Sequence, residues 1–497
     1  MGSRIPAPAI LTPCILIIDQ STSATKAVLF DARGDIVCRA DRGHTQKISP
    51  NGWVAHDPME IYRNTLAAAG DAVKKSGIDP GAIIAVGISN QRETALVWDR
   101  TTGLPVYDAI VWQCARGAEI CNRLSTHGEA IRTRTGLRLS PYFSAAKIAW
   151  VLEHTENQDN NNLCAGTIDS WLVYKLTGNF KTDWSNASRT QLLNLLDLSW
   201  DGEVCGLFGI NPGILPQICD SNACFGKTDF EGLLPKAVPV QAALGDSHGA
   251  LFGQGCLDKG TAKATYGTGS SVMVNIGDKP VFCKSVVTSL AWGRDGKVSY
   301  VLEGNINYTG AVIKWLVEDV GLLASSKEAG RLAAEANPDD TTYLVPAFSG
   351  LGAPHWASGA KACISGMTRN TGRAEIVRAA EESIAYQITD VVRAMEDETA
   401  KLRFDLSLTE LRVDGGPARD SFLMQFQSDI LNLPLSVPEH EELSAAGAAY
   451  MAGLSLGLYP PSVFSRIPRT RYEPDMDDET RTRRYRGWQE AVRTVIN

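Results

Sequence analysis

The sequence predicts an α/β protein made of two similar domains around a central cleft, and three observations carry that prediction. Short apolar strands alternate with amphipathic helices along the chain, a pattern typical of α/β folds. Each half holds two strands joined by a turn rich in hydroxyl groups or glycine, at 20–25 and at 267–269. The chain of 497 residues is too long for one hydrophobic core, which favours two large domains.

The first half opens with a hairpin. Residues 15–18 are a short apolar strand that ends at Asp19, and a second strand covers 28–30. The turn between them, 20–25, carries several hydroxyl groups. We therefore expect a strand–turn–strand unit whose polar tip is exposed to ligands or solvent.

A helix and a buried strand follow the hairpin. Asp57 is expected to cap the helix, with Pro58 in its first position and Glu60 in its third. Gly77 is expected to end the helix. The apolar residues 83–88 then predict a buried strand.

The second half repeats this theme. Strands at 262–266 and 272–276 flank the glycine turn, and a strand at 411–413 leads into a helix at 420–431. Three apolar residues of that helix fall on one face, which indicates a core position: Leu423, Phe426 and Ile430. We expect the boundary between the halves near 253–260, which gives domains of residues 1–255 and 256–497.

Composition disfavours several classes of function. Lys+Arg 48 against Asp+Glu 56 gives a net charge of −8, which disfavours a nucleic-acid partner. The 11 cysteines show no spacing typical of metal sites, so free thiols in a cytoplasmic protein are the simplest interpretation. No stretch reaches the roughly 18 apolar residues of a membrane span.

Asp19 and the turn after it suit a phosphate site. A carboxylate at the end of a strand can hold Mg²⁺ through water, because Mg²⁺ keeps much of its hydration shell. The alternative is an Asx-turn that only closes the hairpin. Thr22, Ser23 and Lys26 supply hydroxyl groups and a cation suited to phosphate oxygens, although ordinary hairpin polarity is the alternative.

Asp246 is the candidate general base. It lies in the segment 245–249, shortly before the hydroxyl- and glycine-rich segment 265–270. A base near a phosphate-binding turn points to phosphoryl transfer onto a hydroxyl group. The alternative role is an N-cap for a helix at 249–253. We expect His248 to be a helix or core residue, since no metal-ligand spacing accompanies it.

Four more residues are candidates for binding a hydroxylated substrate. Arg92 and Glu93 are adjacent, so one can donate and the other accept hydrogen bonds from neighbouring hydroxyl groups. A surface ion pair is the alternative. Trp112 is either a wall on which a sugar stacks or a core residue. Tyr142 either donates to a hydroxyl group or only packs.

These candidates occur within longer runs that together resemble the FGGY family of carbohydrate kinases, and within it the glycerol kinases. The runs are 51–61, 90–94, 109–114, 186–190, 346–354 and 422–430. One family signature is intact at 142–154, with Lys147 and Trp150 in place. A second, at 362–382, has Glu381 where an apolar residue is expected. The resemblance extends over about 15–488.

The resemblance implies two actin-like (ribonuclease-H-type) domains around a cleft, with ATP and Mg²⁺ as cofactors. It makes Asp246 the catalytic base and Asp19 the metal-associated carboxylate. The implied polyol contacts are Arg92, Glu93, Trp112 and Tyr142. The implied phosphate-side positions are Thr22, Lys26, Thr268 and Gly310, and the implied adenosine loop contains Gly416.

The chain departs from the family pattern at positions near both ligands. Ser247 replaces a Gln after the base, and Ser271 replaces a Phe that packs on the substrate's carbon face. Both serines are candidate substrate contacts. On the nucleotide side, Lys314 replaces a Gln and Asp420 an Asn, while Ser21 stands where Gly is usual in the first turn.

We therefore expect ATP-dependent phosphorylation of a terminal hydroxyl group of a small polyol, with glycerol converted to glycerol 3-phosphate. One alternative is a kinase of a longer polyol or ketose. Another is an actin-like sugar sensor without catalytic activity. We expect a polyol and ATP as small-molecule partners, and neither nucleic acid nor a membrane span. The sequence leaves open whether the chain forms a homodimer or a homotetramer.

Overall fold

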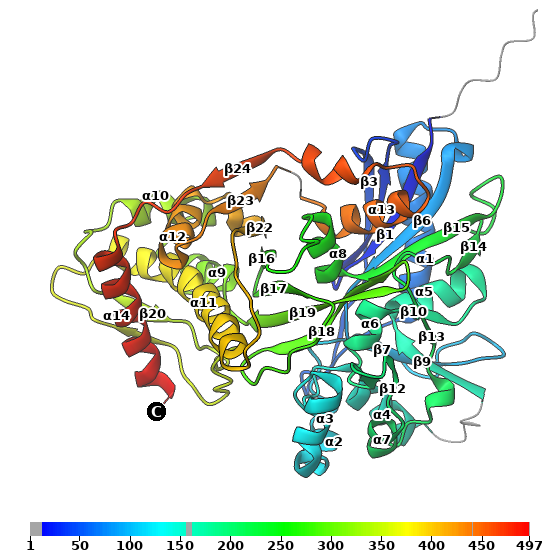
Figure 1. Cartoon of the computed structure of the whole chain (residues 1–497), viewed down its shortest axis with the longest axis horizontal. Helices are drawn as coiled ribbons and strands as arrows, with labels where there is room; N and C mark the ends of the chain where they lie inside the picture. Colours follow the sequence, from blue (N-terminus) through cyan, green and yellow to red (C-terminus); the bar gives the residue numbers. More distant parts are fainter. Residues whose placement is uncertain (1–11, 156–161, 440, 497) are drawn as a thin grey trace, which may run out of the picture. The chain divides into compact units, whose positions relative to one another are not determined.

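The computed structural model describes residues 12–155, 162–439 and 441–496 (Figure 1). The chain divides into two compact units. Unit 1 comprises Met1–Gly253, Leu290–Val298 and Glu442–Arg466, and unit 2 comprises Gln254–Ser289, Ser299–Glu441 and Ile467–Asn497. Each unit is thus built from segments that are far apart in the sequence.

The main sheet of unit 1 has six strands in the order β14-β15-β6-β1-β2-β3. Their bounds are β1 Cys14–Gln20, β2 Ala24–Phe30, β3 Ile36–Gly43, β6 Ile83–Asn90, β14 Gly226–Thr228 and β15 Val238–Gly245. Strands β1 and β2 form the predicted antiparallel hairpin. Strands β1, β6 and β15 run parallel to one another, so their carboxyl ends share one edge of the sheet.

Helix α1 (Pro58–Ser76) shows how local sequence sets an element of unit 1. The Asp57 side chain accepts a hydrogen bond from the Met59 N–H, and Gly77 ends the helix at a φ of 69°, both as predicted. Its buried residues pack in one apolar cluster with the main sheet and helix α5 (Ile168–Thr177). That cluster is one of the hydrophobic cores of unit 1.

The rest of unit 1 surrounds a smaller five-stranded sheet with the order β4-β5-β8-β7-β9. Its strands are β4 Lys47–Ile48, β5 Val54–His56, β7 Ala95–Asp99, β8 Ala109–Ile110 and β9 Leu163–Thr167. Two short strand pairs are β10 Lys181–Asp183 with β13 Gln217–Cys219, and β11 Leu193–Asn194 with β12 Ser199–Trp200. The remaining helices are α2 Ala118–Arg123, α3 Gly128–Thr135, α4 Ser144–His154, α6 Trp184–Ser188, α7 Gly202–Leu207, α8 Asp246–Gly253 and α13 Leu443–Ser455.

The sheet that forms most of unit 2 has seven strands in the order β18-β19-β17-β16-β22-β23-β24, although residues 290–298, which span the end of β18 and the start of β19, are assigned to unit 1. The strands are β16 Ala262–Tyr266, β17 Ser270–Gly277, β18 Val287–Arg294, β19 Lys297–Ile306, β22 Leu411–Gly415, β23 Leu435–Pro438 and β24 Arg469–Tyr472. Its inner order β19-β17-β16-β22-β23 matches β3-β2-β1-β6-β15 of unit 1. The antiparallel and parallel pairings match as well. The prediction of two similar halves is confirmed.

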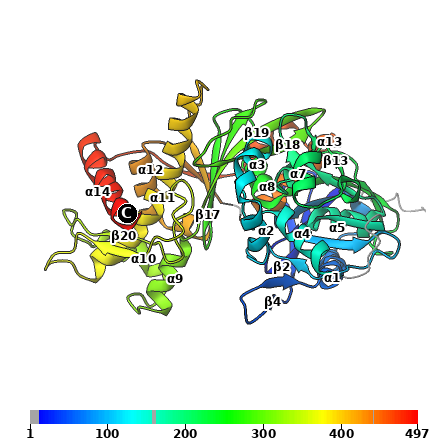
Figure 2. The same ribbon diagram turned by 90° about the horizontal axis from the view of Figure 1, so that it is seen from below.

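Helices α11 (Arg373–Lys401) and α12 (Ser421–Leu431) pack against each other in unit 2 (Figures 1 and 2). The three apolar residues predicted for the core are buried: Leu423, Phe426 and Ile430. The other helices and strands of the unit are α9 Gly310–Glu318, α10 Ala329–Ala334, α14 Asp478–Ile496, β20 Tyr343–Val345 and β21 Cys363–Ser365.

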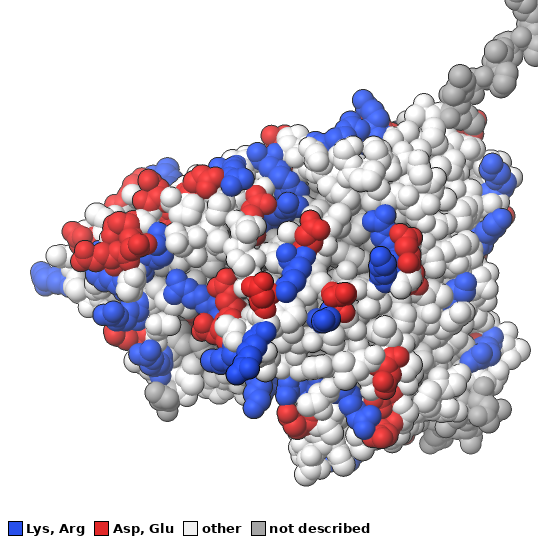
Figure 3. Space-filling model, in the orientation of Figure 1, with Lys and Arg blue, Asp and Glu red and all other residues white. Residues whose placement is uncertain are grey.

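Surface charge is mixed on the face shown in Figure 3, where Lys and Arg lie among Asp and Glu. Within the residues that the structure describes, none of the helices combines the length and apolar character needed to cross a membrane.

Helices α8 and α13 pack so closely that their backbones meet. A Cβ atom added to Gly447 of α13 would lie 1.9 Å from the carbonyl oxygen of Gly249 in α8. One added to Gly253 would lie 2.4 Å from the carbonyl oxygen of Leu443. Only glycine allows this approach, so these residues determine where α8, and Asp246 at its start, lies within unit 1.

We expect Gly447→Ala to destabilise the protein, because the new methyl group overlaps backbone that cannot rotate away. Overpacking of this kind costs about 1–3 kcal/mol, measurable by urea denaturation. Gly70→Ala in α1 is the matched control, since a Cβ there meets nothing within 4 Å. That control should gain roughly 0.5–1 kcal/mol from helix propensity. Equal stability of the two variants would contradict the close packing of α8 on α13.

Candidate functional site

The carboxyl ends of three parallel strands place one group of candidate residues together. Gln20 at the end of β1 pairs with Asn90 at the end of β6, and Asn90 with Gly245 at the end of β15. The segments that leave these strands, 21–23, 91–93 and the start of α8, therefore lie at one edge of the sheet. In α/β folds this edge is where ligands bind.

Asp246 begins α8, so the helix starts three residues earlier than predicted. Its Oδ1 accepts a hydrogen bond from the Ser247 N–H at 2.6 Å and lies 3.3 Å from Nε of Arg92. The Arg92 side chain is 5% exposed, whereas that of Asp246 is 37% exposed. A buried cation thus orients a carboxylate that stays open to a ligand. His248, inside α8, is fully buried, as expected of a core residue.

Gly245 makes the contact between Arg92 and Asp246 possible. A Cβ atom at position 245 would lie 2.6 Å from Cγ of Arg92. The missing side chain leaves the space across which Arg92 extends toward the carboxylate.

Glu93 is held in an unusual backbone conformation. Its φ is 61°, a left-handed value that costs energy for a residue with a side chain. Its Oε1 lies 2.6 Å from Nε of Arg189, and both side chains are almost fully buried. The Ser144 hydroxyl donates to the Glu93 carbonyl oxygen at 3.1 Å. Because Arg92 and Glu93 are both buried, the alternative of a surface ion pair is wrong.

Trp112 and Tyr142 form an aromatic corner in unit 1. Both are half-buried, and their rings meet edge to face with centroids 5.6 Å apart. Nε1 of Trp112 donates to the Thr22 hydroxyl at 2.9 Å, which joins this corner to the hairpin turn. The buried ammonium of Lys147 donates to the carbonyl oxygens of Tyr142 and, at 3.1 Å, Phe143. Burial lowers the pKa of Lys147 to about 7, although Glu93 opposes that shift.

A chain of hydrogen bonds connects the aromatic corner to the turn a second time. The backbone N–H of Trp112 donates to the Thr94 hydroxyl at 3.1 Å, and that hydroxyl donates to Oε1 of Gln91 at 2.8 Å. Nε2 of Gln91 donates to Oε1 of Gln20 at 3.1 Å, and Nε2 of Gln20 donates to the Ser21 carbonyl oxygen at 2.7 Å. Sequence reasoning missed this network, because single polar residues carry no periodic signal.

A group of buried polar side chains holds the sheet edge in place by hydrogen bonds. Asn90 and Asn186 exchange two amide hydrogen bonds of 3.0 Å each. Asp183 accepts from the Asn186 side chain at 2.9 Å, and the Ser185 hydroxyl accepts from the Gly245 N–H at 2.9 Å. The family-like run 186–190 thus has a structural role at this edge.

Asp19 and Lys26 face each other across the first hairpin. They are paired in the register of β1 and β2, and Nζ of Lys26 lies 3.4 Å from Oδ2 of Asp19. Nζ also lies 2.9 Å from Oε2 of Glu442, which immediately precedes α13. Burial raises the pKa of Asp19, against the lowering effect of Lys26. Sequence reasoning missed Glu442, because no local signal links it to a hairpin 416 residues away.

The turn itself forms without the usual glycine. The Ser21 hydroxyl donates to the Ala24 carbonyl oxygen at 2.9 Å, and its backbone does not adopt a left-handed conformation. Thr22 is half-buried and Ser23 is exposed, so both hydroxyl groups lie at the surface of the sheet edge.

A metal at this edge would depend on few protein ligands. Among residues 12–155, 162–439 and 441–496, no group of three or more His, Cys, Asp or Glu residues could hold a metal ion. A single carboxylate such as that of Asp19 is enough for an ion such as Mg²⁺, which takes most of its ligands from phosphate oxygens and water.

Unit 2 places the glycine turn beside the N-terminus of α9. The Gly310 N–H donates to the Gly267 carbonyl oxygen at 2.9 Å, and the Ala311 N–H donates to that of Thr268 at 3.1 Å. Thr268 is exposed. These two hydrogen bonds hold the turn against the first residues of α9, and the dipole of that helix favours an anion beside its N-terminus.

A cavity of about 680 Å³ adjoins this turn within unit 2. It brings together four predicted nucleotide contacts: Gly310, Lys314, Gly416 and Asp420. Asp420 also caps α12, where it accepts from the Phe422 N–H at 2.9 Å. Lys314 is exposed, and its Nζ lies 3.5 Å from Oε2 of Glu318.

Ser271 lies in unit 2 on β17, whereas the other predicted polyol contacts lie in unit 1. Its hydroxyl donates to Oε1 of Glu303 at 3.1 Å, and Glu303 is fully buried. A polar pair therefore occupies this position, where the resemblance to the family predicts an aromatic ring.

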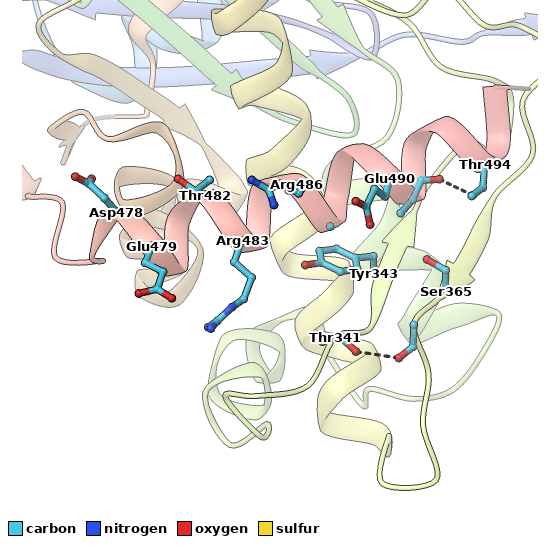
Figure 4. Close-up of a pocket in the computed structure, with 13 residues that line it drawn as sticks. Thr341, Tyr343, Ser365, Asp478, Glu479, Thr482, Arg483, Arg486, Glu490 and Thr494 are labelled. Carbon is cyan, nitrogen blue, oxygen red and sulfur yellow. Dashed lines mark hydrogen bonds between the residues drawn. The ribbon is translucent and has the colours of Figure 1, made fainter.

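A larger hollow of about 910 Å³ lies between α14 and the strands β20 and β21 (Figure 4). The lining residues labelled in Figure 4 are Thr341, Tyr343, Ser365, Asp478, Glu479, Thr482, Arg483, Arg486, Glu490 and Thr494. None of the predicted site residues lines it, so volume alone does not identify the site.

The chain is similar to known carbohydrate kinases over nearly its whole length. The model of the N-terminal domain of the FGGY family of carbohydrate kinases matches residues 14–253, and that of the C-terminal domain matches 262–456. Glycerol kinase 1 of Thermotoga maritima is 47% identical over 97% of this chain and 99% of its own length. Glycerol kinase of Alkaliphilus oremlandii is 43% identical, with 97% of each chain covered.

A solved structure extends the similarity to the fold. The structure of Plasmodium falciparum glycerol kinase with ADP matches with a TM-score of 0.91 and 35% identity, covering 98% of this chain and 99% of that chain. A xylulose kinase from Lactobacillus acidophilus, at 21% identity, has the same fold with a TM-score of 0.87. The chain therefore belongs to the FGGY family of carbohydrate kinases.

Proposed function

We propose that this kinase transfers the γ-phosphoryl group of ATP to a terminal hydroxyl group of glycerol, giving glycerol 3-phosphate. The observation that carries the proposal is the half-exposed Asp246 carboxylate, fixed by buried Arg92 at the same sheet edge as the hydroxyl-rich turn. The full-length relatives named glycerol kinase support glycerol as the substrate. Family membership favours an enzyme over a sensor without activity.

Asp246 is proposed to act as general base. Its carboxylate accepts the proton of the attacking hydroxyl group, while Arg92 keeps it oriented. Trp112 and Tyr142 form a wall for the carbon chain, and Arg92 and Glu93 bind its other hydroxyl groups. Because Lys147, Arg189 and the buried amides fix these side chains, little reorganisation is needed when the substrate binds.

Unit 1 is proposed to contribute to phosphate binding. Thr22, Ser23 and Lys26 of unit 1 supply hydroxyl groups and a cation for phosphate oxygens. Asp19 would hold nucleotide-bound Mg²⁺ through water, and that ion would offset charge on the phosphates. Domain 1–255 thus carries the polyol site and the first phosphate turn.

Domain 256–497 is proposed to bind the nucleotide. Thr268 and Gly310 line the path of the phosphates, Lys314 adds positive charge, and Gly416 and Asp420 border the adenosine. Transfer requires the phosphate held by this domain to reach the hydroxyl group at Asp246. Positioning and charge neutralisation supply most of the barrier reduction in such reactions.

Replacing Asp246 by Asn should keep the shape of the site but remove the proton acceptor. We expect turnover to fall on the order of 10²–10⁴-fold. Binding of glycerol and ATP, measured by calorimetry, should change by no more than a few-fold. Asp197→Asn is the control, because Asp197 is exposed and is none of the candidate site residues. Near-normal turnover of Asp246→Asn would show that the carboxylate only starts the helix.

A longer polyol or a ketose is the second candidate substrate, and the Ser271–Glu303 hydrogen bond favours it. A phenylalanine at this position would give an apolar wall, whereas the serine adds space and hydrogen-bonding groups. A four- or five-carbon substrate would use both.

Restoring the ring tests this second candidate. Ser271→Phe should narrow the enzyme toward glycerol, with selectivity changing roughly 10–200-fold. The measurement is kcat/KM for glycerol, erythritol, xylitol and xylulose. Ser271→Ala, which removes the hydroxyl group without adding a ring, separates the loss of polarity from the loss of space. A wild type that ignores every longer substrate, together with an unchanged Ser271→Phe, would contradict an enlarged pocket.

A further inference from the structure

Glu381 is a buried acid that lines the cavity of unit 2. It lies on α11, is 3% exposed and lines the cavity together with Gly416 and Asp420. Its Oε2 is buried and makes no hydrogen bond to any residue that the structure describes. The resemblance to the family signature predicts an apolar residue at this position.

An acid in such a place is costly unless something binds it. A buried polar group without a hydrogen bond is less stable than one whose hydrogen bond is made. Burial and, to a lesser extent, the charge of Asp420 raise the pKa of Glu381 to about 8. The protonated form, which this pKa favours at pH 7, has one O–H donor and one carbonyl acceptor side by side.

The charged residues that line the cavity suit a different part of the nucleotide from Glu381. Lys314, Glu318, Lys327, Arg419 and Asp420 are the titratable or charged residues that line it besides Glu381. The cations suit the phosphates, whereas a neutral acid contributes no charge to bind them. What suits Glu381 is an uncharged group with an adjacent donor and acceptor.

On the edge that carries N7, adenine presents that pair, because its exocyclic amino group lies next to the N7 acceptor. Guanine presents two acceptors, O6 and N7, at the corresponding edge. We propose that Glu381 recognises the base of the nucleotide, with its carboxyl group accepting from the adenine amino group and donating to a neighbouring ring nitrogen. This inference rests on the proposed function, which places the nucleotide in this cavity.

The experiment compares ATP with GTP in three proteins. Glu381→Gln keeps a donor beside an acceptor, so its ATP/GTP ratio of kcat/KM should stay within about threefold of wild type. Glu381→Leu restores the apolar character of the family and should lower that ratio about 10- to 100-fold. Both changes remove a buried acid and should be compatible with folding. Glu396→Gln, on the same helix outside the cavity, should leave the ratio unchanged.

The pH dependence separates recognition from packing. Deprotonation of Glu381 removes its donor, so ADP binding by the wild type should weaken as pH rises from 7 to 9.5. Glu381→Gln cannot ionise and should not show this loss. A ratio in Glu381→Leu equal to that of wild type, or the same pH profile in wild type and Glu381→Gln, would overturn the proposal.

Direct binding keeps the two proposals distinguishable. Calorimetry with ADP and GDP requires no phosphoryl transfer. Selective ADP binding that Glu381→Leu abolishes, in a protein that phosphorylates no polyol, would support the role of Glu381 and refute the proposed function. Failure of the wild type to bind either nucleotide would refute both.

Discussion

The direction of the strands is the constraint on which the site in unit 1 depends. Because β1, β6 and β15 are parallel, the segments that follow them leave the sheet at one edge. The three segments carry different chemistry, namely a hydroxyl-rich turn, an adjacent Arg and Glu, and an Asp at a helix start. Pairing by backbone hydrogen bonds brings them together although they are distant in sequence. Unit 2 uses the same strand order to place its glycine turn beside Gly416.

Buried polar groups then hold these segments in place. The ion pair of Glu93 with Arg189 is shielded from solvent and stabilises the strained backbone at Glu93. Removing one partner of such a pair would leave an uncompensated buried charge, which is far more costly than losing an exposed ion pair. The site is therefore rigid at its base, while Asp246 and the turn hydroxyls remain accessible.

Much of the fold could be predicted because its signals are local. Apolar runs and turns located both hairpins, and Asp57 with Gly77 located the ends of α1. The strand ends also located Asp19, Arg92 and Asp246. The partners of these residues could not be predicted in the same way. Glu442, the amide chain through Gln91 and the contact of Lys147 with Tyr142 depend on tertiary packing, which leaves no spacing in the sequence.

The segment Glu442–Arg466 has a consequence for synthesis on the ribosome, since it completes unit 1 from the far end of the chain. The first 253 residues emerge long before α13 exists to cover the glycine face of α8. During that interval Lys26 also lacks the carboxylate of Glu442. The half of the protein that is made first is thus finished almost last, and a truncated N-terminal product cannot hold a fully formed site.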